Sequence, residues 1–108
     1  MTNNISQLIS DAKEIGFVSS VIGKSAESYH THRRDLFQYL WMCEFKIWLI
    51  INHNIDVQVI HWNNVGYLYS VKERPHNGNQ YDVSDNYHNI NKAFATALNK
   101  AIIHLKSK

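Results

Sequence analysis

The stretch "QYLWMCEFKIWLIINHNI", residues 38–55, decides the fold, because so many apolar side chains must be buried somewhere. A helix that spans a membrane needs about 20 consecutive apolar residues. Glu44 and Lys46 interrupt this stretch, and the uncharged run from Ile47 to Ile55 is less than half of that length. The sequence therefore predicts a buried helix and no contact with a membrane.

A long helix is expected to begin at Asp35 and to carry apolar residues on two sides. At about 100° per residue, six of them share one stripe, which we expect to face the core: Leu36, Leu40, Cys43, Ile47, Ile50 and Ile51. The second side presents Met42, Phe45 and Leu49. Either residues 17–34 cover this second side or it is free to contact a partner, and the sequence leaves both alternatives open.

Beyond Asn54 the spacing of apolar residues changes from that of a helix to that of a strand. Two strands are expected, at 55–62 and 67–74, joined by a three-residue loop in which Gly66 provides a positive φ angle. This loop predicts the opposed pairs on both faces: Val57–Glu73, Val59–Val71, His61–Tyr69, Asp56–Arg74, Gln58–Lys72, Ile60–Ser70 and Trp62–Leu68. The segment "YDVS", residues 81–84, is short enough to be a third strand at the edge of the sheet.

Two further helices are marked by the residues at their ends. The first covers Asn4–Ile15, and Gly16 follows it at the position of a left-handed C-cap. The last begins at Ile90, after the N-cap Asn89, and continues to Leu105. Residues 17–34 have no sustained period, which indicates an irregular connection between the first helix and the long one.

The expected order of elements is therefore α, loop, α, β, β, β, α. This order predicts an α+β fold of two layers, in which helices cover one face of a small antiparallel sheet. The 108 residues suffice for a modest core, so we expect a single domain over residues 1–108.

Composition and charge exclude several classes of protein. The net charge of +2 is too small, by itself, to indicate electrostatic binding of nucleic acids or membranes. Cys43 is the only cysteine, which excludes a disulfide within the chain and fits a reducing compartment. The N-terminal residues lack the pattern of an export signal, so we expect a cytoplasmic location.

Histidine and cysteine are the residue types that most invite a catalytic or metal-binding hypothesis. His30 and His32 are close enough to share an ion, but no cysteine pair or carboxylate–histidine cluster completes a zinc site. Cys43 lies on the predicted core stripe, where a thiol behaves as a small hydrophobic side chain rather than as a nucleophile. We therefore expect no enzymatic activity, no metal site and no cofactor.

Two groups of residues are the expected partner-binding surfaces, because their apolar side chains lack an obvious place in the predicted core. One group lies on the open face of the sheet, with a lysine beside it: Ile60, Trp62, Leu68 and Lys72. The other is the second side of the long helix: Met42, Phe45 and Leu49. The alternative is RNA binding, in which a base stacks on Trp62 and basic side chains contact phosphates, Arg33, Arg34 and Arg74 among them.

Three segments of the chain resemble small uncharacterised proteins that are common in phages and prophages of Bacteroidota: "AKEIGF" at 12–17, "YLWMCEFKIWLIINHNIDVQV" at 39–59 and "YHNINKAFATALNKAIIHL" at 87–105. Those proteins typically have an "AKEKGF"-like helix end, a "WL…HNI" junction between helix and strand, and a last helix with paired "EAL" steps. Trp48, Leu49 and residues 53–55 match this pattern, whereas residues 91–93 replace its acidic "EEA" start.

The resemblance implies a source rather than an activity, and it provides no catalytic residue. Small phage-encoded domains without enzyme motifs are often binders that act against host defences, including anti-CRISPR inhibitors. We therefore expect a non-enzymatic accessory protein that binds a host protein or ribonucleoprotein and inhibits a defence nuclease complex. It is expected to act as a monomer or a homodimer in the host cytoplasm.

Overall fold

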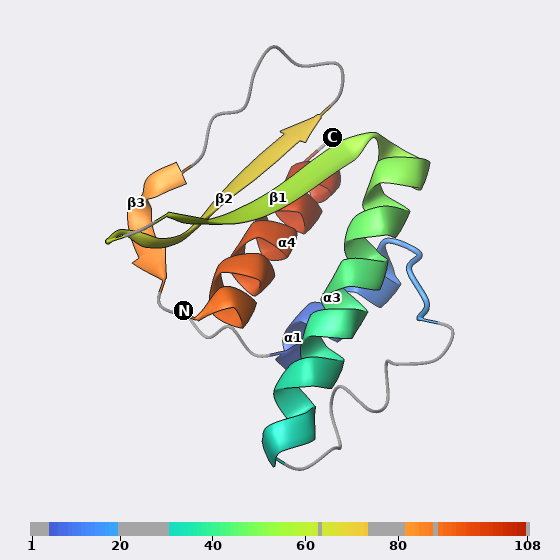
Figure 1. Ribbon diagram of the computed structural model, residues 1–108. Coiled ribbons are helices and arrows are strands. Elements are labelled where there is room, and N and C mark those ends of the chain that lie inside the picture. The colour runs from blue at the N-terminus through green and yellow to red at the C-terminus, as the bar shows by residue number, and fades with distance from the viewer. Residues whose placement is uncertain (1–4, 20–30, 63, 74–81, 88, 108) are drawn as a thin grey trace.

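The computed structural model describes residues 5–19, 31–62, 64–73, 82–87 and 89–107 (Figure 1). These residues form helices and strands in the following order along the chain: α1 (Ile5–Glu14), α3 (Thr31–His53), β1 (Ile55–Trp62), β2 (Gly66–Glu73), β3 (Asp82–Tyr87) and α4 (Ile90–Lys106). The strands are antiparallel and the helices lie in separate segments of the chain, so the predicted α+β class is confirmed.

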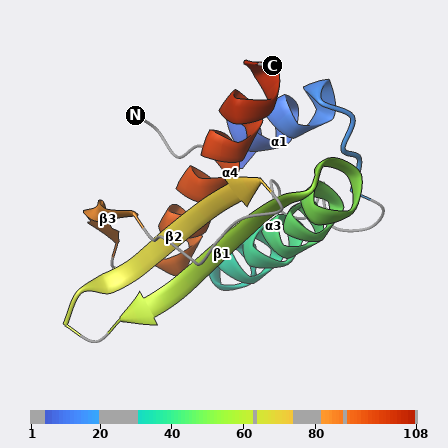
Figure 2. The ribbon, with the colours of Figure 1, turned by 90° about the horizontal axis from the view of Figure 1, so that it is seen from above.

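The helix α4 holds the described elements together. It contacts β1, β2 and β3, and it also contacts α1 and α3. In addition, α3 contacts β1, and Figures 1 and 2 show α3 along one edge of the molecule. The buried face of α4 is rich in alanine, whose side chain is a single methyl group, and this allows neighbouring elements to approach closely: Ala93, Ala95, Ala97 and Ala101.

Two helix ends follow the capping residues that the sequence predicts. Gly16 has a φ angle of 103°, and its N–H donates to the carbonyl of Lys13. The N–H of Phe17 donates to the carbonyl of Ala12, which completes a Schellman motif at the end of α1. At the start of α4, the side chain of Asn89 accepts a hydrogen bond of 2.8 Å from the N–H of Asn91.

The long helix α3 buries the side opposite to the one that the sequence analysis predicts. Trp41, Met42, Phe45 and Leu49 are each at most 1% exposed. Four residues of the predicted core stripe are instead 38% to 74% exposed, and we name them the outer stripe of α3: Leu36, Leu40, Ile47 and Ile51. The prediction is wrong because both sides of the helix are apolar, so the hydrophobic pattern alone does not indicate which side is buried. Burial of the aromatic side removes more apolar surface from water.

Phe17 covers the buried side of α3. Its ring centroid lies 4.9 Å from that of Phe45 and 5.6 Å from those of Trp41 and Trp48, and its side chain is 3% exposed. Two residues further on, Ser19 Oγ donates a hydrogen bond of 2.5 Å to Glu44 Oε1. The start of the 17–34 segment therefore covers the second side of the helix, which was one of the two alternatives left open.

Other boundaries in this region also differ from the prediction. The helix α3 begins at Thr31 rather than at Asp35, so it includes the end of the predicted irregular connection. It ends where Asn54 adopts a left-handed φ angle of 56°, which asparagine tolerates better than most residues, and β1 then begins at Ile55. No helix of the described segments is both long and apolar enough to span a membrane.

The register between β1 and β2 differs from the prediction by two residues. The observed pairs are Ile55–Glu73, Asp56–Lys72, Val57–Val71, Gln58–Ser70, Val59–Tyr69, Ile60–Leu68, His61–Tyr67 and Trp62–Gly66. Each predicted pair is wrong because Gly66 (φ 112°) is not part of the loop but pairs with Trp62, while Asn64 (φ 66°) provides a left-handed turn inside the loop. A shift of two residues leaves every side chain on its predicted face.

The third strand is longer than expected and pairs only locally. It covers Asp82–Tyr87 rather than residues 81–84. Its partners in β2 are Tyr67, which pairs with Tyr87, and Tyr69, which pairs with Asp82, and the register shifts between them. Regular pairing is therefore concentrated in the β1–β2 hairpin.

We expect that Phe17→Ala lowers the free energy of unfolding by about 3–5 kcal/mol, because the substitution leaves a cavity against Phe45 and the two tryptophans. Chemical denaturation measures this change. The matched control is Val18→Ala at the adjacent position, where the side chain is 75% exposed and a change within about 0.5 kcal/mol is expected. Equal effects of the two substitutions would contradict the role given to Phe17.

Candidate functional site

The predicted surface on the sheet is only partly accessible. Trp62 is 56% exposed, Ile60 and Lys72 are half-buried, and Leu68 is completely buried. Leu68 is therefore not an exposed contact residue, and that part of the prediction is wrong. Trp62 and Lys72 are also not brought together, because Trp62 pairs with Gly66 and six residues of an antiparallel strand span about 20 Å.

The end of the β1–β2 hairpin carries three side chains with rings. It extends beyond α3 and α4 (Figure 2). Trp62 and His61 are both exposed, and because they are consecutive in β1 their side chains lie on opposite faces of the strand. The centroid of the His61 ring lies 4.9 Å from that of the half-buried Tyr67. We call Trp62, His61 and Tyr67 the hairpin end. Tryptophan and tyrosine are enriched among the residues that dominate binding energies in protein interfaces.

The apolar side of α3 that is exposed is the one opposite to the predicted contact surface. Met42, Phe45 and Leu49 are at most 1% exposed, so they belong to the core and are not available to a partner without unfolding. The accessible apolar surface of α3 is the outer stripe. Its members are separated along the chain by four, seven and four residues.

The basic and histidine residues singled out from the sequence fall largely outside the described part of the structure. Arg33 and Arg34 lie in the first turns of α3, where only the backbone is described, and Arg74 lies outside the described residues. His30 lies outside them too, and His32 is described only as a backbone position in α3. Within the described residues, no three histidine, cysteine or carboxylate side chains are grouped so as to hold a metal ion.

Cys43 has a tyrosine beside it rather than a base. It is half-buried on α3, and Tyr39 lies one helical turn before it. The hydrogen bond with Cys43 raises the pKa of Tyr39 above its ordinary value, and the negative charge of the thiolate and partial burial act in the same direction. A group whose pKa is raised stays protonated near neutral pH, so Tyr39 is not a base for the thiol.

A small pocket at the other end of the hairpin, with both apolar and charged lining residues, is a site that the sequence analysis missed. Its volume is about 240 Å³, below the range of typical ligand pockets. It is lined by side chains from β1, β2 and α4: Ile55, Val71, Glu73, Lys100 and His104. Lys100 Nζ also lies 5.2 Å from the centre of the Tyr69 ring. The sequence gives one signal for this site, the i, i+4 spacing of Lys100 and His104, but only the fold brings Glu73 beside them.

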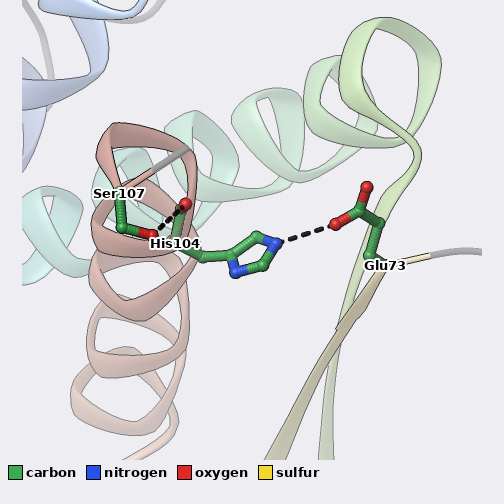
Figure 3. A network of polar contacts seen from close by, with 3 residues as sticks. All are labelled: Glu73, His104 and Ser107. Carbon is green, nitrogen blue, oxygen red and sulfur yellow. Dashed lines mark hydrogen bonds and ion pairs between the residues drawn. The ribbon is translucent and has the colours of Figure 1, made fainter.

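Glu73, His104 and Ser107 have the residue types of a catalytic triad, but their hydrogen bonds differ from those of a triad (Figure 3). His104 Nε2 lies 2.8 Å from Glu73 Oε1, and both side chains are nearly half exposed. In a triad the serine hydroxyl donates to the imidazole, which then takes its proton. Here Ser107 Oγ donates instead to the main-chain carbonyl of His104, at 2.8 Å. The imidazole therefore has no contact through which it could activate this hydroxyl.

Comparisons with known proteins add no relative. No family model matches the chain, and neither curated proteins nor solved structures give a match.

We expect that a fluorophosphonate probe, which reacts with activated serines, does not label Ser107, because the hydroxyl has no base. Intact-protein mass spectrometry measures the labelling. A known serine hydrolase treated in parallel is the positive control, and Ser107→Ala identifies any label at this position. Stoichiometric labelling that disappears in Ser107→Ala would show that the three residues form a working triad.

Proposed function

We propose that the protein is a non-enzymatic binding protein, and that it contacts a host macromolecule through the hairpin end. The observation that carries the proposal is Trp62, a large aromatic side chain that is 56% exposed on a hairpin extending beyond the helices. Exposing so much aromatic surface to water is unfavourable, and such side chains frequently anchor interfaces.

The expected partner follows from the resemblance to phage and prophage proteins of Bacteroidota. We propose that the protein acts in the host cytoplasm as an anti-CRISPR-like inhibitor that occupies a surface of a defence nuclease complex. A partner of this kind offers both protein and guide-RNA surfaces. The ring pair of His61 and Tyr67 suits either surface, since aromatic rings stack on bases and also pack against apolar side chains.

A protein surface is favoured over RNA as the direct contact. RNA-binding modules combine aromatic rings with a nearby basic surface. At the hairpin end the nearest residues along the two strands are uncharged, and Lys72 is about 20 Å away along β2. The RNA-binding alternative remains as an outcome of the test.

We expect that Trp62→Ala weakens capture of the partner by about 30-fold, which corresponds to the loss of a typical interface hot spot. The measurement is a pull-down from a host that carries a defence nuclease, read by mass spectrometry and RNA sequencing, followed by affinity measurement on the recovered partner. Ile103→Ala is the matched control, because Ile103 is 58% exposed on α4, remote in the chain from the hairpin.

Two further outcomes decide between the hypotheses. Affinity that falls steeply with salt, by about 0.7 log units per log unit of salt for each phosphate contact, would assign the direct contact to RNA. Equal capture by the wild type and Trp62→Ala would overturn the hairpin end as the contact surface. Inhibition of target cleavage by the isolated nuclease complex, lost in Trp62→Ala, is the expected functional result.

A further inference from the structure

The outer stripe of α3 is a second apolar surface, separate from the hairpin end. Its four side chains are 55%, 38%, 56% and 74% exposed in chain order, although each is a large aliphatic group. They extend over about 22 Å of helix. An exposed apolar surface of this continuity is typical of an interaction site rather than of isolated surface residues.

The spacing of the outer stripe is symmetric about its centre. Leu36 and Leu40 are four residues apart, as are Ile47 and Ile51, and the midpoint of both the inner and the outer pair falls between Cys43 and Glu44. If two α3 helices are placed antiparallel around a two-fold axis at this midpoint, Leu36 faces Ile51 of the other copy. Leu40 then faces Ile47 of the other copy. Every member of the outer stripe meets an aliphatic partner.

This self-complementarity is what a symmetric dimer requires, because in such an interface the same surface patch must fit itself. We propose that the outer stripe binds a second copy of this chain, with the two α3 helices antiparallel. A partner of different sequence would not require the symmetric spacing. The proposal concerns a surface other than the one in the proposed function, so either can fail without the other.

The residues around the two-fold axis allow the two α3 helices to approach each other closely. Cys43 is half-buried, and it lies on one side of the stripe centre. Glu44 lies on the other side, and its carboxylate accepts the hydrogen bond from Ser19 of its own chain. The two carboxylates would lie at the rim of the interface, where water screens their repulsion.

The surface area available on α3 indicates a weak dimer. The 23 residues of α3 extend over about 35 Å, and the outward half of a helix of that length has a surface of at most about 600 Å². Two copies would thus bury at most about 1,200 Å², which only reaches the lower end of the range for stable complexes. We therefore expect an equilibrium between monomer and dimer that depends on protein concentration.

The first test is sedimentation velocity over a concentration series from low micromolar upward. We expect the wild type to shift from monomer to dimer, and Ile47→Lys to remain monomeric because the charge is introduced twice, once on each side of the two-fold axis. Ile103→Lys is the matched control, with 58% exposure against 56% for Ile47, and it should dimerise like the wild type. Circular dichroism verifies that each variant is folded.

The second test determines the direction of the helices. In a Cys43→Ser background, Leu36→Cys and Ile51→Cys variants are prepared separately, mixed and treated with a short bismaleimide. An antiparallel dimer gives a crosslink between the two different variants and little between identical ones, whereas a parallel dimer gives the reverse. The reverse pattern would overturn the antiparallel arrangement.

The remaining outcomes of these tests would each overturn the proposed dimer. A wild type that stays monomeric at every concentration overturns the dimer, as does a dimer that Ile47→Lys leaves intact. If the wild type is monomeric and Ile47→Lys instead removes a different protein from the pull-down, the outer stripe has a partner other than a second copy, and the proposal is overturned in favour of that partner.

Discussion

The contact between Phe17 and the aromatic side of α3 is the interaction on which the described structure depends. Phe17 lies against Trp41, Phe45 and Trp48. Its position is fixed by the Schellman motif at the end of α1. Because α3 is apolar on both sides, this contact helps to decide which side is buried. The same choice places the outer stripe in water, so the core and the proposed dimer surface have one physical origin.

The parts of the fold that could be predicted are those that local rules determine. Gly16 and Asn89 mark helix ends because their backbone and side-chain chemistry satisfy groups that the helix leaves free. The alternation of apolar residues places Val57, Val59 and Val71 on the core side of the hairpin, and this holds even though the register was wrong. The α+β class follows from the order of these local patterns.

The orientation of α3 and the hairpin register could not be read from the sequence, for different physical reasons. The two sides of α3 differ in side-chain volume more than in hydrophobicity, and a periodicity argument does not weigh volume. The register depends on whether Asn64 or Gly66 takes the left-handed position within the loop, and both residue types tolerate it. The contact residues predicted on α3 follow from the first error, and Met42, Phe45 and Leu49 are buried. Leu68 is also buried, although the shift of register leaves its side chain on the predicted face, whereas Trp62 is exposed. The pocket beside Glu73 and His104 was missed because these two residues are 31 residues apart in the chain.

The central position of α4 also has a consequence for synthesis. This helix follows all other described elements in the chain, yet it contacts every one of them. While the chain is being made, the hairpin and α3 therefore emerge before the element that joins them, and the apolar surface of α3 that Phe17 does not cover is still unprotected. Nascent chains in this condition are prone to misassociation. The alanine-rich face of α4 can then be added late, because its small side chains require little rearrangement of the elements already in place.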